Sequence, residues 1–175
     1  PFKRKHDKPA VFWSGIVDLN KETVVHYQVP ETFNGSLRVL AVAVNDTRIA
    51  SAAKQTLVRG DLIITPNAPF LAAPGDEFTV SVAVANHVKS SGEKAPVEVK
   101  LSAPPGLQVQ GDSKKTLTIA EGHEGVTTFR IKTQDAEKVT LGTATLEFEA
   151  VSTGKSAHVH TDLSIRPAIP KMTSL

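Results

Sequence analysis

Apolar and polar residues alternate with a period of two along much of this 175-residue chain. The clearest example follows Gly75, where Phe78, Val80, Val82 and Val84 alternate with threonine, serine and alanine. Such alternation is typical of a β-strand that rests one side on a hydrophobic core. We find no stretch with a convincing helical period, so the pattern predicts an all-β protein.

Residues 61–166 contain a series of such segments, separated by turns such as the one at Gly154. About seven strands of this kind are enough for a complete antiparallel β-sandwich of the immunoglobulin or fibronectin type. The first apolar run, Leu62–Ile64, is expected to stop at Pro66, and a later strand is expected over Val139–Val151. The predicted core consists of Phe78, Val80, Val82, Val84, Val99, Leu101, Phe129, Ile131, Leu146, Phe148, Val159 and Leu163.

Residues 11–58 offer fewer strands. Strands are predicted over Val11–Leu19, Thr23–Val29 and Ser36–Val44, with a turn at Asn34-Gly35, whereas Ile49–Val58 could be strand or loop. The segment Ser36–Val44 is apolar on both faces, which predicts a strand covered on two sides. About four strands make a poor closed sandwich, so this part should need a partner.

The pattern therefore divides the chain into four parts. Residues 1–10 are expected to be a flexible basic leader, and residues 11–58 to be the C-terminal strands of a partial domain. Residues 61–166 are expected to form a complete sandwich, and residues 167–175 to be a linker, since prolines stop the last strand.

Composition and charge narrow the function. The net charge of +2 is close to neutral and argues against nucleic acid as the main partner. Cysteine is absent, which excludes disulfides, thiolate metal sites and cysteine nucleophiles within these residues. No apolar run reaches the roughly 18 residues of a membrane span, and no signal peptide is visible. The chain begins abruptly at Pro1 and is expected to be an excised piece of a larger protein. Basic residues gather in the leader at Lys3, Arg4, Lys5 and Lys8.

Two of the six histidines could serve a metal ion. His158 and His160 share one face of a predicted strand, and Asp162 is the only same-face neighbour in line to be a third ligand. A solvated strand face explains the pattern more simply, so we predict no metal site. The other histidines are His6, His26, His87 and His123, of which His26 is expected on a polar strand face.

Acidic pairs give an equally weak signal for catalysis. Glu147 and Glu149 share a strand face, as exposed carboxylates do on many antiparallel strands, while Glu121 and Glu124 lie in a loop with His123. No nucleophile stands in a recognisable elbow, and no Gly-rich phosphate loop precedes a helix. We therefore predict no enzymatic activity, no catalytic residue and no cofactor.

Trp13 has two interpretations. It could stack on a ligand from an exposed face, but as the only Trp of an aliphatic sandwich it is expected in the core. Gly15 beside it would allow close packing or a bulge. Farther along, Asp76 follows Gly75 and is expected to cap or turn its loop.

Several motifs carry a family resemblance. The stretch Asp61–Asn86 has a short strand, an apolar-Pro-Phe-Leu segment, Pro-Gly-Asp and an alternating strand ending in Asn. It resembles a macroglobulin-like domain of a bacterial alpha-2-macroglobulin. The preceding motifs Phe12–Gly15, Val29–Glu31 and Leu37–Ala43 resemble the family's stretch just before that domain. These motifs cover residues 11–86, and the remainder agrees in pattern only.

The resemblance implies fibronectin- or immunoglobulin-like macroglobulin domains within a broad-spectrum protease inhibitor. In that family a protease cuts a bait region, the molecule changes shape, and a thioester captures the attacker or a cage sequesters it. This chain would follow the bait region and act as scaffold that supports or relays the change, because the Cys-x-Glu-Gln thioester motif is absent. Its partners would be other domains of the parent protein and, through the whole protein, target proteases.

The resemblance also implies a place in the cell. The parent would be a periplasmic lipoprotein, held at the inner membrane by a lipid anchor elsewhere in its chain, with a role in evading host defence. Two alternatives stay open. A tandem of adhesion or carbohydrate-binding β-sandwiches usually shows exposed aromatics or a dense acidic calcium loop, and this sequence has few aromatics and no such loop. An enzyme would need the missing catalytic motifs.

Overall fold

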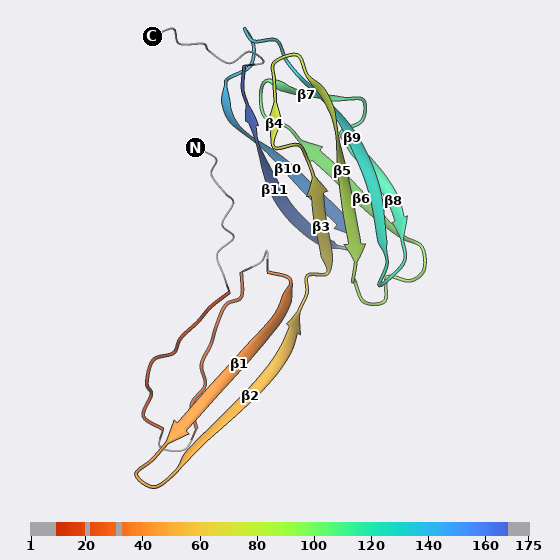
Figure 1. Ribbon diagram of the computed structural model, residues 1–175. Coiled ribbons are helices and arrows are strands. Elements are labelled where there is room, and N and C mark those ends of the chain that lie inside the picture. The colour runs from red at the N-terminus through yellow and green to blue at the C-terminus, as the bar shows by residue number, and fades with distance from the viewer. Residues whose placement is uncertain (1–9, 20–21, 31–32, 168–175) are drawn as a thin grey trace, which may run out of the picture. The chain divides into compact units, whose positions relative to one another are not determined.

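The computed structural model describes residues 10–19, 22–30 and 33–167. It divides into two compact units, residues 1–60 and residues 61–175. Every regular element of the described chain is a β-strand (Figure 1). The prediction of an all-β, mainly antiparallel fold is therefore confirmed, and the predicted leader falls largely outside the described residues.

The second unit is a sandwich of two sheets. One sheet has the strand order β4-β11-β10-β6-β8, and the other has the order β3-β5-β9-β7. The order β3-β5-β9-β7 in one sheet and the adjacent strands β11, β10 and β6 in the other match the strand arrangement of an immunoglobulin domain. The strands are β3 (Leu62–Asn67), β4 (Leu71–Ala72), β5 (Glu77–Asn86), β6 (Ala95–Ser102), β7 (Leu107–Gln110), β8 (Lys114–Ile119), β9 (Glu124–Thr133), β10 (Gly142–Ser152) and β11 (Lys155–Ile165).

The core lies between these two sheets and follows the predicted alternation. Ten of the twelve predicted core residues are buried, while Phe78 and Val159 are half-buried and pack against the edge of the cluster. The strands are held in register by tight turns: Thr153 and Gly154, both at positive φ, join β10 to β11 in a two-residue hairpin. Asp76 makes the predicted turn, its carboxylate accepting from the Ala73 amide at 2.7 Å.

Two predicted strand boundaries are wrong. β3 continues through Pro66 to Asn67, because β3 is an edge strand and residues of even number direct their nitrogen away from β5. That parity follows from the hydrogen bond between the His87 amide and the Asp61 carbonyl. At the other end, Val139 is buried but lies in a turn closed onto Asp135, so β10 begins at Gly142.

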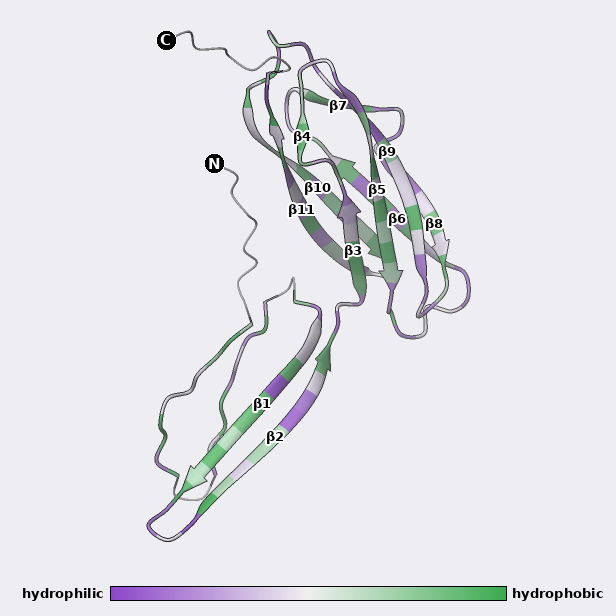
Figure 2. Ribbon diagram, viewed as in Figure 1, coloured by the Kyte–Doolittle hydropathy of each residue, from purple (hydrophilic) through white to green (hydrophobic). Residues whose placement is uncertain are grey.

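The first unit contains a single long hairpin. β1 (Gly35–Val44) pairs with β2 (Ile49–Val58) without interruption, so the segment that could be strand or loop is a strand. Asn45 closes the turn, its side-chain oxygen accepting from the amides of Thr47 and Arg48 at 3.0 and 2.8 Å. Figure 2 shows apolar positions running along much of β1.

Three predictions for this unit are wrong. Val11–Leu19 and Thr23–Val29 form no strand, because the described residues offer them no ladder partner. The two segments touch through Phe12 and Tyr27, whose ring centroids lie 5.3 Å apart. Asn34-Gly35 does not make a hairpin turn; instead the Asn34 side chain accepts from the Gly60 amide at 2.8 Å.

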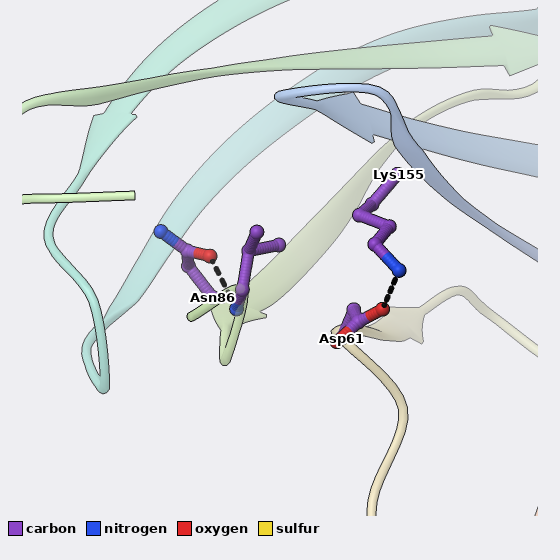
Figure 3. A network of polar contacts seen from close by, with 4 residues as sticks. Asp61, Asn86 and Lys155 are labelled. Carbon is purple, nitrogen blue, oxygen red and sulfur yellow. Dashed lines mark hydrogen bonds and ion pairs between the residues drawn. The ribbon is translucent and has the colours of Figure 1, made fainter. Parts of the chain in front are cut away.

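One buried polar residue, Asn86, links several segments at the end of the sandwich where β3 begins. Asn86 is fully buried; its amide donates to the Ile119 carbonyl and to the Ser91 hydroxyl, each at 3.0 Å, and its oxygen accepts from the Val88 amide at 3.0 Å. Figure 3 shows Asn86 near the ion pair between Asp61 and Lys155, which spans 2.9 Å. The pair is half exposed, so Asn86 contributes more to stability.

Replacing Asn86 with alanine should lower the free energy of unfolding of the second unit by about 2–6 kcal/mol. The Ile119 carbonyl and the Val88 amide would lose buried partners, each at a cost of roughly 1–3 kcal/mol. Urea unfolding followed by far-ultraviolet circular dichroism measures the difference. The matched control is Asn67→Ala, at an exposed position of β3, which should change stability by less than about 0.5 kcal/mol. Equal losses in the two variants would show that the buried network is unimportant.

Candidate functional site

The predicted histidine and carboxylate residues lie on the outer face of the β10–β11 hairpin. The register places Glu149 opposite His158, Glu147 opposite His160, and Thr145 opposite Asp162. The His158 Nε2 to Glu149 Oε1 distance is 3.9 Å, and the Thr145 hydroxyl donates to the Asp162 carboxylate at 2.7 Å. A shallow hollow of about 310 Å³ borders these histidines. Asp162 is thus engaged by a hydroxyl and stands two residues from His160.

This face shows no assembled metal centre. Among the described residues no three His, Asp or Glu side chains are grouped so that they could hold a metal ion. The pairs are cross-strand neighbours spread along an exposed ladder, which is the arrangement of a solvated sheet face. The predicted absence of a metal site stays a prediction that solution binding must test.

Glu121, from the predicted acidic loop that also holds His123 and Glu124, has a structural role. The Glu121 carboxylate accepts from the amide of Ser90 at 3.0 Å, and the His123 Nδ1 lies 3.0 Å from the Glu121 carbonyl. Ser90 has a positive φ of 62°, an uncommon value for a residue other than glycine. Glu121 therefore helps to hold this strained turn, and Glu124 lies exposed at the start of β9.

Trp13 does not lie in a core. Its side chain is 79% exposed, which overturns the expectation that it is buried. Gly15 has a positive φ of 75°, which favours glycine, and open space where a side chain would point, so the predicted close packing is absent there. The segment around Trp13 belongs to no sheet of the described chain. His26 is exposed, but the strand face predicted for it does not form, because Thr23–Val29 is not a strand.

The most unusual surface of the chain is the hairpin β1–β2 itself. Leu40, Val42 and Val44 of β1 share one face with Ile49 of β2, and Leu57 lies farther along the same face, beyond the row of Arg38 and Gln55. These five side chains are 59–76% exposed. Monomeric soluble proteins rarely leave such contiguous apolar area in water. We call this surface the large-residue face of the hairpin.

The opposite face of the hairpin is apolar toward the turn, where its side chains are small. Leu37 and Val39 begin it opposite Thr56 and Lys54, and alanines continue it to the turn. Both faces therefore have the composition of a strand that is covered on two sides, as the sequence predicted for Ser36–Val44. The alanines of this small-residue face are Ala41, Ala43, Ala50 and Ala52.

Taken by fold and surface, the chain is a module of immunoglobulin-like β-sandwich architecture that carries an uncovered apolar hairpin. The model of the Alpha-2-macroglobulin family matches residues 10–101. The chain belongs to the alpha-2-macroglobulin family, as its motifs suggested.

Curated relatives agree over nearly the whole chain. It is 41% identical over 174 residues to an alpha-2-macroglobulin homolog of Yersinia pestis, covering 99% of this chain and 8% of that protein. It is 40% identical over 179 residues to an alpha-2-macroglobulin of Pasteurella multocida, covering 98% of this chain and 9% of that protein. The chain thus spans less than a tenth of the length of these two relatives.

Solved structures show the same fold. A Salmonella alpha-2-macroglobulin reacted with methylamine is similar with a TM-score of 0.62 and 20% identity, over 79% of this chain and 9% of that chain. A trypsin-activated alpha-2-macroglobulin from Escherichia coli is similar with a TM-score of 0.58 and 22% identity, again over 79% and 9%. At this identity the likeness concerns architecture alone.

Zinc should not bind to the β10–β11 face with a defined stoichiometry. The two imidazoles stand beside carboxylates on an exposed ladder with no third ligand grouped around a common centre. Isothermal titration calorimetry of the 175-residue chain with zinc checks this expectation. The double variant His158→Ala/His160→Ala is the control, and its heat should match that of the unaltered chain. A one-to-one site tighter than about 1 µM that the double variant loses would overturn it.

Proposed function

We propose that this chain is a scaffold segment of a bacterial alpha-2-macroglobulin, a protease inhibitor that traps proteases after they cut its bait region. Within it the second unit would serve as a rigid spacer, and the first unit would dock onto other parts of the parent. The observation that carries the proposal is the exposed apolar hairpin of the first unit, in a chain that belongs to this family and whose second unit is a complete sandwich.

The energetics of the hairpin support a docking role. Burying a valine, leucine or isoleucine side chain stabilises a fold by about 1.5–3 kcal/mol, and the large-residue face leaves five such side chains mostly in water. A two-stranded hairpin alone is marginally stable. Because β1 and β2 form the only ladder among the described residues of this unit, further strands must come from outside them for the face to be covered.

We infer that the covering strands come from sequence of the parent that precedes residue 1, across the bait insertion. The large-residue face would then pack on a facing sheet, and the small-residue face would admit a closely approaching layer. Residues 11–19 and 22–29 fit this picture, because most of their large apolar side chains are exposed and they lack a ladder partner among the described residues. They would become strands once the missing neighbours are present, and Trp13 would then find cover.

The remaining parts of the inhibitor's mechanism would lie elsewhere in the parent. Residues 1–175 contain no cysteine, so a thioester that captures a protease would be formed by another region. The described chain has no helix of the length and apolarity that spanning a bilayer requires. We propose a periplasmic location for the parent, with a lipid anchor outside these residues, on the strength of the family resemblance. Target proteases would be met by the whole protein.

The two units should differ in their ability to fold alone. Residues 61–170, expressed as a separate polypeptide, should unfold cooperatively on heating, because their two sheets enclose a core of their own. Residues 1–60 should show no cooperative transition, because the hairpin has no facing sheet. Differential scanning calorimetry measures both. A cooperative, monomeric transition for residues 1–60 would contradict the idea of a divided domain and with it the position after a bait region.

A charge placed on the large-residue face should act only in the parent. Val42 is 68% exposed, so Val42→Lys should change the melting behaviour of the 175-residue chain very little. In the full-length parent the same lysine would be buried under the covering strands and should lower stability by roughly 2–4 kcal/mol. The matched control is Thr118→Lys, at an exposed position of β8. If the parent tolerates Val42→Lys as well as the control, the hairpin is not a docking surface.

A further inference from the structure

The second unit protects most of its sheet edges against pairing with other strands. Proteins do this with short edge strands, prolines and lysines. Here β7 has four residues and β4 has two, β3 carries Pro66, and β8 begins with Lys114 and Lys115. All four strands lie at the edges of their sheets.

One long edge is protected less, by a lysine at its first residue, Lys155. β11 has eleven residues, but β4 pairs only with Ser164 and Ile165. Pro69, which has no N–H, lies just before β4 and limits its extension. The stretch Lys155–Leu163 therefore has an assigned ladder with β10 alone, with no proline and no bulge along it. We call this stretch the β11 edge (Figure 1).

The hydrogen bonds to β4 reveal which amides point toward this edge. The amides of Ser164 and Arg166 donate to the carbonyls of Phe70 and Ala72, on the side away from β10. Successive residues of a strand alternate sides, so the amides of Ser156, His158 and Asp162 point the same way. None of these three amides has a hydrogen-bond partner in the described part of the chain. Amides of odd number, such as Val159, point toward β10.

Charge and shape along the edge define what would fit it. Asp162 lies on its outer face, with Glu147 and Glu149 on the neighbouring strand, while Lys100 is one strand farther in. On the inner side Val159 is only half-buried. A strand added here would place every second side chain beside His158, His160 and Asp162, with the Glu147 and Glu149 carboxylates one strand away, and the others at the rim of the core.

We propose that, in the parent protein, an extended segment from outside residues 1–175 pairs with the β11 edge, with basic side chains outward and apolar side chains inward. The proposal rests on the proposed function in that the chain is a segment of a longer protein. The curated relatives leave ample sequence for such a segment, because this chain spans 8% and 9% of two of them. A second copy is a poorer occupant, since it would join two outer faces that are both acidic.

Amide hydrogen exchange resolved to single residues tests the proposal directly. In the isolated 175-residue chain the amides of Ser156, His158 and Asp162 should exchange fast, whereas that of Val159 should be slow. In the full-length parent the three edge amides should slow by about 100-fold or more, and Val159 should stay slow. Equally fast exchange of the edge amides in the two proteins would overturn the proposal. That failure would leave the proposed function standing, because Val42→Lys tests a different surface.

Two further arms fix the nature of the occupant. Slow exchange of the edge amides in the isolated chain that becomes slower with concentration would identify a second copy and overturn the assignment to the parent. In the parent, Glu147→Gln/Glu149→Gln should speed exchange of the edge amides several-fold. Glu124→Gln, on the other sheet, should leave it unchanged. Full protection in the double variant would show that the occupant is not basic and would overturn that part of the proposal.

Discussion

The structure depends on one constraint: an apolar sheet face must be covered by another layer. The second unit meets it internally, since two sheets of alternating strands enclose Phe129, Phe148 and their neighbours. The first unit does not, because a single hairpin that is apolar on both faces has no second sheet within the described residues. The same rule thus predicts that the second unit is stable by itself and that the first requires a partner.

Much of the second unit follows from local pattern. Period-two alternation located the strands, and the buried positions of β5, β6, β9 and β10 are those that the pattern marks. Two things could not be obtained in this way. β4 has only two residues and so no period, and Val139 is buried by a turn, which an alternating pattern mistakes for strand. The prediction that the first strand stops at Pro66 is wrong because the effect of a proline depends on whether its strand lies at a sheet edge.

The first unit and the candidate sites were predicted less well, for a physical reason. Strand propensity in Val11–Leu19 is realised only when a ladder partner exists, and Trp13 is buried only when something covers it, so both depend on sequence outside the segment. The sequence alone predicts that the histidines and carboxylates of β10 and β11 lie on exposed strand faces. The pairing of Glu149 with His158 required the register of β10 and β11, which the turn at Thr153 and Gly154 sets.

The parallel pairing of β4 with β11 has a mechanical consequence. Tension between Asp61 and Arg166 would draw β4 toward its N-terminal end and β11 toward its C-terminal end. In a parallel pair these opposite pulls shear the hydrogen bonds from Ser164 to Phe70 and from Arg166 to Ala72 together, instead of opening them one after another. Because these bonds would be loaded together, the β4–β11 pair would resist a pull along the chain in one step.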